Sequence, residues 1–360
     1  MSGVFESVPN FSEGVDADFL RRAGDGEDVL DLHADAAHNR SVVTLCAEDP
    51  DRLLTSLLEL IAMAHERIDL RRHRGLHPRV GVADVVPVVA LGGAGEERAA
   101  ALARRVGEEI WGRLGIPVCW YGSLAEGRRL ADIRRRPLPD LGTEAHATAG
   151  ICCVGSRPPL VAYNLVFDLP RPDVSAAAAE LRRLPGVRTL TFPLADGRVQ
   201  LSMNLTSPAR AGAAVVFAAA AESLGVEPEA ELVGLCPAAA AGPGCDGGLL
   251  EGRLGAAAAR RAAGRAERRG DAEAVLLAGR LRTAAGRLAD LPADQGSLLD
   301  GAEIAVGLRR VLEAADLGGG GVLAMLQVAA EELDAALVES TRKRHPERSR
   351  LLRHWLVQTA

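Results

Sequence analysis

Two histidines and four arginines are concentrated in residues 71–81, a segment that Gly75, Pro78 and Gly81 interrupt. Histidine has the side-chain pKa nearest neutrality, so it can give and take a proton at working pH. Arginine offers a planar, permanently charged fork that fits a carboxylate. The segment therefore predicts acid/base chemistry on a carboxylate-bearing substrate.

Two regular elements would position this segment. Residues 50–68 carry apolar side chains at helical spacing, and residues 82–91 form a β-branched apolar run. A glycine- and proline-broken stretch between a helix and a strand is a loop, and loops on a rigid scaffold carry most catalytic groups.

The order of the expected elements occurs twice along the chain. The first set has strands at 3–9, 29–32, 41–46 and 82–91 with helices from 16 and over 50–68, and is extended by a helix at 96–114 and a strand at 117–121. The second set has strands at 160–167, 187–192, 198–204 and 231–235 with helices at 174–184 and 209–224. Both orders are β-α-β-β-α-β, the split βαβ pattern. We expect an α/β (α+β) fold with duplicated ferredoxin-like subdomains.

The composition changes after Pro237. Residues 239–248 are rich in alanine, glycine and proline, which predicts a linker. Residues 249–360 predict a C-terminal helical region of about four helices, broken near 291–294 and 318–321. The expected domains are 1–155, 156–238, the linker 239–248 and the helical accessory region 249–360.

Charge and composition exclude several classes of protein. The net charge of −6 gives no general attraction to nucleic acid. No apolar run is long enough for a membrane span, and the N-terminus lacks the pattern of a signal peptide. The six cysteines form no C-x-x-C array, so no metal site or disulfide framework is indicated, and buried free thiols in the cytoplasm are expected.

Several motifs in this chain resemble those of the formiminotransferase (glutamate formimidoyltransferase) family. Residues 6–14 read E-S-V-P-N-F-S-E-G, and residues 73–87 fit the family stretch H-x-G-x-H-P-R-x-G-x-x-D-V-x-P. Shorter matches follow in the family's order at residues 39–42, 162–164, 203–206 and 231–237. They cover residues 4–238, so the first two expected domains resemble the family's N-terminal and C-terminal subdomains. The tail matches no cyclodeaminase motif.

The resemblance implies an enzyme that moves a formimino group from N-formimino-L-glutamate to tetrahydrofolate, a co-substrate, in histidine degradation. N5 of the folate would attack the amidine carbon, and glutamate would leave as an amine that needs a proton. His77 occupies the family's catalytic acid/base position. The family also implies a homodimer. Whether a cyclodeaminase acts in trans is left open.

The other expected site residues each have a structural alternative. Arg79 and Arg40 would hold substrate carboxylates, or are ordinary surface arginines. His73 would line the pocket, or is a solvated loop residue. The resemblance implies an aspartate where this chain has His33, and Asp35, two residues later on the same face of an extended segment, would replace it as the acidic partner. Asn10 would bind substrate or cap a helix.

Residues 140–151 resemble the family's folate-contacting segment. The expected folate contacts are Gly142, Thr143, His146, Thr148 and Gly150. The family's phenylalanine and one or both prolines are missing from this segment. Two alternatives to the leading function follow: a family member with a shifted acceptor or donor, and a non-catalytic protein that binds a folate-like ligand or acts as a scaffold.

Overall fold

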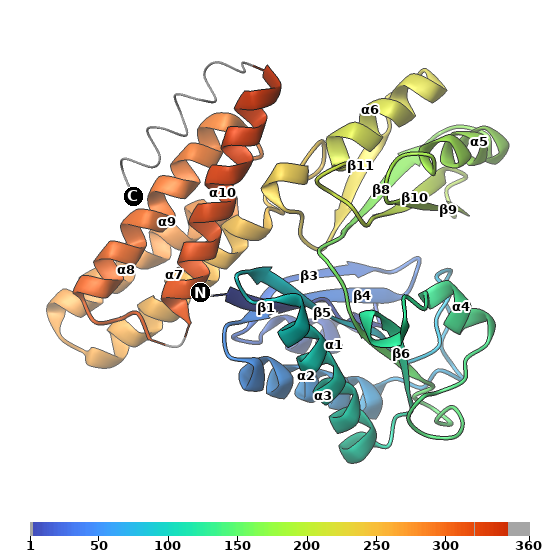
Figure 1. Cartoon of the computed structure of the whole chain (residues 1–360), viewed down its shortest axis with the longest axis horizontal. Coiled ribbons are helices and arrows are strands. Elements are labelled where there is room, and N and C mark those ends of the chain that lie inside the picture. Colours follow the sequence, from blue (N-terminus) through green and yellow to red (C-terminus); the bar gives the residue numbers. More distant parts are fainter. Residues whose placement is uncertain (1–2, 320, 345–360) are drawn as a thin grey trace. The chain divides into compact units, whose positions relative to one another are not determined.

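The computed structural model describes residues 3–319 and 321–344. The chain divides into two compact units between Pro159 and Leu160 (Figure 1). The first unit contains one sheet with its helices. The second contains another sheet and the C-terminal helices. The predicted four-part division of the chain stays a prediction.

The first unit is built on a seven-stranded sheet. Its strands are β1 (Gly3–Ser7), β2 (Asn10–Phe11), β3 (Val29–Asp35), β4 (Arg40–Ala47), β5 (Ala83–Gly92), β6 (Val118–Gly122) and β7 (Cys152–Ser156). Its helices are α1 (Ala17–Gly24), α2 (Pro50–Arg67), α3 (Glu96–Leu114), α4 (Leu130–Arg135) and the 3-10 turn η1 (Ser123–Ala125). β1 and β2 both pair with β4 and with β5, all antiparallel, and β3 pairs with β4 at the edge. Beyond β5 the sheet continues with parallel β7 and β6.

Side chains that alternate along the strands divide this sheet into two faces. Val43 and Leu45 of β4 join the large core that contains α1, α2 and α3. On the opposite face Ile133 of α4 packs with Val85 and Tyr121. The two faces therefore have different partners, and α4 is the helix that covers the second face beside β6 and β7.

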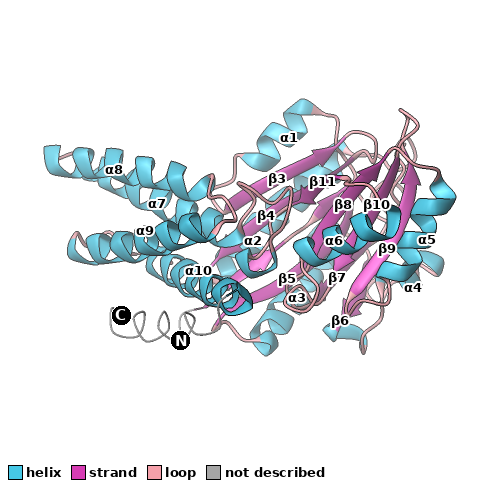
Figure 2. Ribbon diagram, turned by 90° about the horizontal axis from the view of Figure 1, so that it is seen from above, coloured by secondary structure: helices cyan, strands magenta, loops and turns pink. Residues whose placement is uncertain are grey.

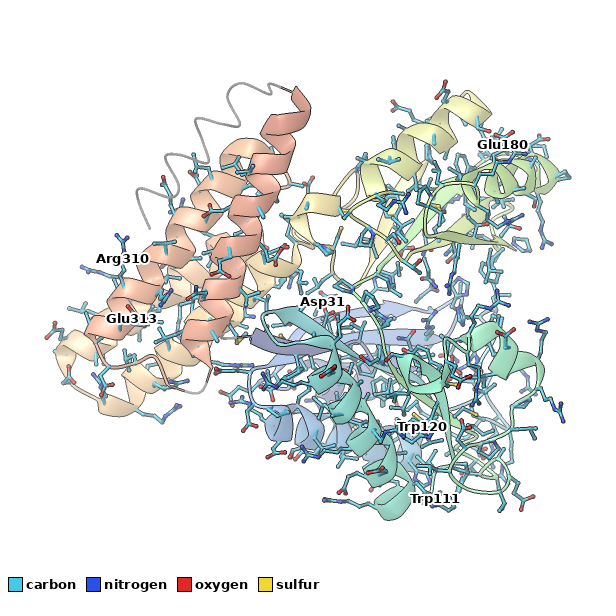
Figure 3. All side chains as sticks on the ribbon, viewed as in Figure 1. Asp31, Trp111, Trp120, Glu180, Arg310 and Glu313 are labelled. Carbon is cyan, nitrogen blue, oxygen red and sulfur yellow. The ribbon has the colours of Figure 1, made fainter. Side chains whose placement is uncertain are left out.

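Trp120 shows how closely α3 approaches the sheet. A Cβ on Gly107 of α3 would lie 2.3 Å from the Trp120 ring, so glycine is needed at this crossing. Figure 3 shows Trp120 beside α3, with Trp111 near the end of the same helix. The Arg104 guanidinium lies 5.6 Å from the centre of the Trp120 ring, a cation–π contact.

The second unit begins with a four-stranded antiparallel sheet in the order β11-β8-β10-β9. Its elements are β8 (Val161–Phe167), α5 (Arg171–Leu181), β9 (Val187–Pro193), β10 (Val199–Leu205), α6 (Ala213–Leu224) and β11 (Glu229–Val233). In the first unit β5, β1, β4 and β3 stand in the equivalent order. The prediction of an α/β fold of the α+β class, with the split βαβ order repeated, is confirmed.

The C-terminal region is helical, as predicted. It consists of α7 (Leu250–Arg269), α8 (Ala272–Ala289), α9 (Gln295–Ala314) and α10 (Val322–Arg344), which run alongside one another in Figure 2. The breaks expected near 291–294 and 318–321 are present. The break at Gly270 was not predicted. Gly270 ends α7 with φ 76°, a left-handed conformation that glycine adopts without strain.

The segment predicted as a linker is packed against the second sheet. The Tyr163 hydroxyl donates to the Pro243 carbonyl at 2.6 Å, and the Cys236 amide donates to the Gly248 carbonyl at 2.9 Å. The short turn η2 (Ala238–Ala240) overlaps its start, and the Ala238 amide donates to Glu251 of α7 at 3.0 Å. Arg253 of α7 donates to the Gly247 carbonyl at 2.9 Å. Hydrogen bonds therefore join this segment both to the second sheet and to α7.

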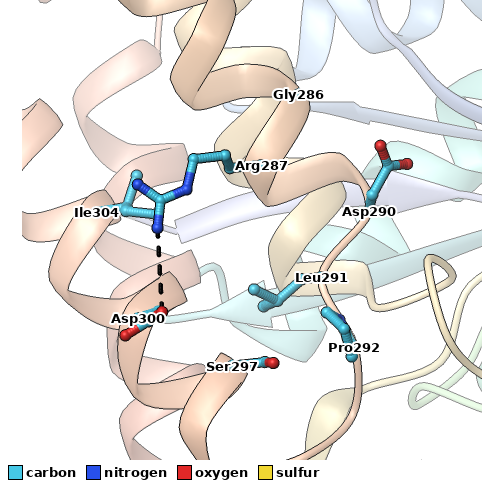
Figure 4. Close-up of a pocket in the computed structure, with 8 residues that line it drawn as sticks. All are labelled: Gly286, Arg287, Asp290, Leu291, Pro292, Ser297, Asp300 and Ile304. Atoms are coloured by element: carbon cyan, nitrogen blue, oxygen red, sulfur yellow. Dashed lines mark ion pairs between the residues drawn. The ribbon is translucent and has the colours of Figure 1, made fainter.

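An open depression of about 440 Å³ lies between α8 and α9 (Figure 4). Leu291, Pro292 and Ile304 line it, and Arg287 lies 3.9 Å from Asp300 at its wall. None of the predicted site residues borders it. Elsewhere, all six cysteines are buried and none forms a disulfide. No helix in the described ranges is both long and apolar enough to cross a bilayer.

Candidate active site

The histidine-rich loop lies between α2 and β5 and returns along the β3–β4 turn. The Leu76 amide donates to the Ala37 carbonyl at 3.3 Å. A Cβ on Gly75 would lie only 2.2 Å from the His38 carbonyl oxygen, so only glycine permits this approach. The loop is thereby held over the start of β4, where Arg40 emerges.

His77 is half-buried in this loop and is held in its neutral form. Its Nδ1 lies 2.7 Å from the Pro78 carbonyl, which can only accept, so Nδ1 carries the proton and Nε2 is the basic nitrogen. Burial, together with the nearby Arg40, Arg134 and His38, lowers the pKa of His77 to about 2. A neutral imidazole amid positive charge can accept a proton, and it becomes a stronger base when an anion arrives.

Arg79 makes its contacts within the chain. Its Nε and Nη2 both donate to the His77 carbonyl, at 3.1 Å and 2.7 Å, and Nη2 also donates to the His38 carbonyl at 3.0 Å. Its Nη1 contacts the His73 ring. These contacts fix the loop around His77, and the expected role of Arg79 as a carboxylate ligand stays a prediction.

His73 is a structural partner of that arrangement. Its Nε2 lies 3.0 Å from the Asn39 carbonyl and its Nδ1 meets the Arg79 guanidinium. Nε2 therefore donates and Nδ1 accepts, which requires a neutral ring. Burial first, then Arg79, lowers the pKa of His73.

Arg40 has a guanidinium donor that can bind a ligand. It stands at the first position of β4, and its buried Nε has no hydrogen-bond partner among the described residues. Burial lowers its pKa to about 10, with Arg134 and Arg79 adding to the shift and Asp84 opposing it. This Nε makes Arg40 a candidate carboxylate ligand, because a buried donor without a partner is costly.

Arg134 reaches the same place from α4. Its Nη2 lies 2.7 Å from Oδ2 of Asp84, while Oδ1 of Asp84 accepts from the Val80 amide at 2.6 Å. Asp84 lies at a register shift, because Asn10 faces Val85 whereas Phe11 faces Ala83. Such a bulge re-aims the side chain of the extra residue, here toward α4.

Asp35 contacts His38. The Asp35 Oδ2 lies 3.8 Å from His38 Nε2, and Oδ1 accepts from the His38 amide at 2.9 Å. The ring of His38 faces that of His77 edge-on, with 5.9 Å between ring centres. His38 therefore lies in contact with both Asp35 and His77, and the predicted role of Asp35 as the acidic partner stays a prediction.

The N-terminal motif is hydrogen-bonded to the segments that form the site. The Ser12 hydroxyl donates to the Gly81 carbonyl at 2.8 Å, and the Gly14 amide donates to Asn39 Oδ1 at 2.9 Å. Glu13 accepts from the amides before α1, a capping role. The side chain of Asn10 donates to the Val8 carbonyl at 2.8 Å, so its substrate-binding role stays a prediction.

The predicted folate segment falls into two places. His146 and Gly150 exchange backbone hydrogen bonds, the Ile151 amide donates to the Val80 carbonyl, and Leu70 binds the Thr148 carbonyl, so this part lies beside the histidine loop. Gly142 instead packs against Trp111 and Pro117, and Thr143 is exposed. His146 Nδ1 accepts from the Ala149 amide at 3.1 Å and its ring meets that of His65.

Sequence reasoning missed two residues at this site, His38 and Arg134. His38 precedes the Asn-Arg pair that had been noted, and Asn39 adopts φ 45°, the left-handed turn that brings His38 back against Asp35. Arg134 lies in an arginine run that gave no indication of which member would point inward. Only the structure distinguishes the three: Arg134 is half-buried, whereas Arg135 and Arg136 are exposed.

Comparison with known proteins shows the family of this chain. The model of the formiminotransferase domain, N-terminal subdomain, matches residues 4–157. The glutamate formimidoyltransferase of Thermoplasma acidophilum is 36% identical over 269 residues, which cover 65% of this chain and 88% of that protein. This chain belongs to the formiminotransferase family.

Other relatives extend the comparison. The glutamate formimidoyltransferase of Streptococcus pyogenes serotype M1 is 32% identical over 236 residues, 58% of this chain and 79% of that protein. The formimidoyltransferase-cyclodeaminase of Gallus gallus is 35% identical over 188 residues, 46% of this chain and 35% of that protein. Membership of the formiminotransferase family identifies the chain as an enzyme, a transferase. The residue roles given above remain predictions.

Proposed function

We propose that this enzyme transfers the formimino group of N-formimino-L-glutamate to tetrahydrofolate in histidine degradation, with His77 as the acid/base residue. The proposal is supported most directly by one observation: the neutral imidazole of His77 lies beside Arg40 and Arg134, so a proton carrier and two carboxylate-binding cations are gathered at one place. The predictions of a cytoplasmic homodimer stay predictions.

The reaction requires one proton to cross from acceptor to leaving group. N5 of tetrahydrofolate attacks the formimino carbon, a new C–N bond forms, and Nε2 of His77 accepts the proton that N5 loses. His77 then donates this proton to the glutamate nitrogen as the old C–N bond breaks. Glutamate leaves as an amine, and His77 returns to its neutral form. A positioned acid/base group of this kind contributes about 10²–10⁴ in rate.

The arginines bind and also tune this step. Arg40 binds a substrate carboxylate, to which its Nε, without a partner among the described residues, can donate, and Arg134, oriented by Asp84, contributes a second positive charge. A bound carboxylate offsets the charge that lowers the pKa of His77, so the imidazolium becomes accessible only when substrate is present. Arg79 holds the loop in register through the His77 and His38 carbonyls.

Tetrahydrofolate is proposed to contact the part of the folate segment that lies beside the loop, His146, Thr148 and Gly150. Gly142 and Thr143 would flank it. Because this segment departs from the family pattern, a shifted acceptor is kept as the second candidate function.

The test is a stoichiometric assay on the purified full-length chain. N-formimino-L-glutamate and tetrahydrofolate are mixed, and glutamate release and folate modification are both measured. Equal amounts of the two products are expected. Glutamate release without folate modification would establish a different acceptor, and no release at any folate concentration would refute the proposed donor.

A further inference from the structure

His38 occupies the position between an acidic group and the proposed acid/base residue. Its side chain is 7% exposed, its Nε2 lies 3.8 Å from Asp35 Oδ2, and its ring meets His77 edge to face at 5.9 Å between centres. The side chains follow one another in the order carboxylate, imidazole, imidazole, so that His38 contacts both Asp35 and His77.

The backbone holds His38 in this place from two sides. Its amide donates to Asp35 at 2.9 Å, and its carbonyl accepts from Arg79 at 3.0 Å. Arg79 also binds the His77 carbonyl, at 2.7 Å. One guanidinium therefore spans the two residues and sets the distance between their backbones, so the ring contact does not depend on side-chain rotamers alone.

We propose that His38 is a positioning residue for His77: held by Asp35 and Arg79, it orients the His77 ring and controls when that ring takes up a proton. This inference rests on the proposed function. His38 is not required to touch substrate. Its effect is to make a positive charge on His77 less favourable, because two adjacent imidazolium rings would repel each other.

The other charges around His77 are nearly fixed. Arg40 on β4, Arg134 on α4 and Arg79 in the loop stay positive, and Asp84 on β5 is paired with Arg134. His73, from the loop itself, is committed to Asn39 and Arg79 as a neutral ring. His38 is the remaining neighbour, and it acts in the direction of a lower pKa for His77, after burial and the arginines.

The experiment compares full-length wild type with His38→Gln, which removes the imidazole ring and keeps a polar side chain. Nitrogen NMR of the histidine rings follows protonation of His77 downward in pH as far as circular dichroism shows a native fold. The onset of His77 protonation is expected about 0.5–1 pH unit higher in His38→Gln than in wild type. The acid limb of the kcat profile should shift in the same direction, with kcat lowered about 3- to 30-fold and KM for N-formimino-L-glutamate within about twofold.

Arg72→Gln is the matched control, because it removes a positive charge from the same loop at a side chain that is 89% exposed. It should shift neither the NMR onset nor the kinetic profile. Unchanged His77 resonances in a folded His38→Gln protein would overturn the inference. An equal shift in both variants would overturn it too, since the cause would then be general loop charge.

A second variant covers the case in which His38→Gln does not fold. Asp35→Asn retains both rings and removes only the carboxylate, so the His77 ring-nitrogen shifts should change if the pair acts on His77. Identical shifts would overturn the inference. A failure of the proposed function would give a different result. The variants would then still change the His77 ring-nitrogen shifts, but wild type would not transfer the formimino group of N-formimino-L-glutamate.

Discussion

Oδ2 of Asp84 lies 2.7 Å from Nη2 of Arg134, joining β5 to α4 across fifty residues of sequence. The carboxylate is almost fully buried and the guanidinium is mostly so. Through Val80, which donates to the other carboxylate oxygen, the same aspartate also fixes the end of the histidine loop. The pair thus connects the two segments that supply charge to His77.

Replacing Asp84 with asparagine should destabilise the protein by about 1–3 kcal/mol, because a mostly buried guanidinium loses its charged partner. Denaturant unfolding measures the change. Arg135→Gln, on the same helix with an ion pair to Asp132 at the surface, is the control and should cost no more than about 0.5 kcal/mol. Equal effects in the two variants would mean that the buried pair has no special weight.

Replacing His77 with glutamine should lower kcat by about 10²–10⁴ while the protein stays folded, because the proton path from N5 to the leaving amine is removed. Single-turnover transfer and circular dichroism check the two parts. A variant with turnover within a few-fold of wild type would remove His77 from the mechanism.

The two arginines of the site should respond differently to lysine. Arg40→Lys should raise KM for N-formimino-L-glutamate about tenfold with little loss of stability, because a bidentate edge becomes a point charge. Arg79→Lys should instead lower kcat and stability, because the three hydrogen bonds to the His77 and His38 carbonyls cannot all be kept. If Arg79→Lys changed only KM for N-formimino-L-glutamate, this result would support the predicted role of Arg79 as a carboxylate ligand.

Gly75→Ala should displace the loop, since its Cβ would meet the His38 carbonyl at 2.2 Å. We expect a loss of at least about 1 kcal/mol in stability and a marked fall in activity. Gly112→Ala is the matched control. A Cβ there meets nothing within 4 Å on α3, so stability should rise by about 0.5–1 kcal/mol. Thermal unfolding of both variants provides the comparison.

The half-buried His77 should make the unfolding free energy of the protein decrease in acid. The folded-state pKa of His77 is about 2, below its ordinary value of 6.5, so from about pH 6.5 downward the unfolded state binds a proton that the folded state refuses. The contribution of His77 to stability is complete above that pH and falls by at most about 1.4 kcal/mol per unit as pH decreases. Glu6, whose pKa burial raises to about 7, acts in the opposite direction. The difference between wild type and His77→Gln in unfolding free energy, followed from about pH 7 to pH 5, isolates the histidine. A constant difference would contradict the expectation.

The sequence predicted most of the elements because their patterns are local. Leu53, Leu57 and Ile61 of α2 repeat at helical spacing and do face the hydrophobic core of the first unit. β7 was missed because Cys152–Ser156 contains glycine and serine and only one β-branched residue. It is a strand because β5 and β6 pair with it on both sides, and this tertiary context is not visible in five residues.

The site was predictable only where it is continuous in sequence. His73, His77 and Arg79 lie in one motif, and the structure keeps them together. His38 depends on a left-handed residue in the preceding turn, and Arg134 depends on the packing of Ile133 against the sheet, which decides the face that α4 presents. Arg79 was predicted as a carboxylate ligand because its type suits a carboxylate, and that role stays a prediction. Its hydrogen bonds to the His77 and His38 carbonyls were not predicted, because only folding brings these groups within reach.

The register shift at Asp84 makes the spacing of the chain part of the chemistry. Ala83 and Val85 face Phe11 and Asn10 across the same short ladder, and the extra residue between them is what turns the Asp84 carboxylate toward Arg134. A one-residue deletion in this stretch would therefore have an effect that a point substitution does not have. Asp84 itself could be retained, while the change of register moved its carboxylate to the opposite face of the sheet. In a collection of natural or laboratory variants, we expect insertions and deletions between Gly81 and Val86 to be lost from functional clones even where substitutions at neighbouring positions are tolerated.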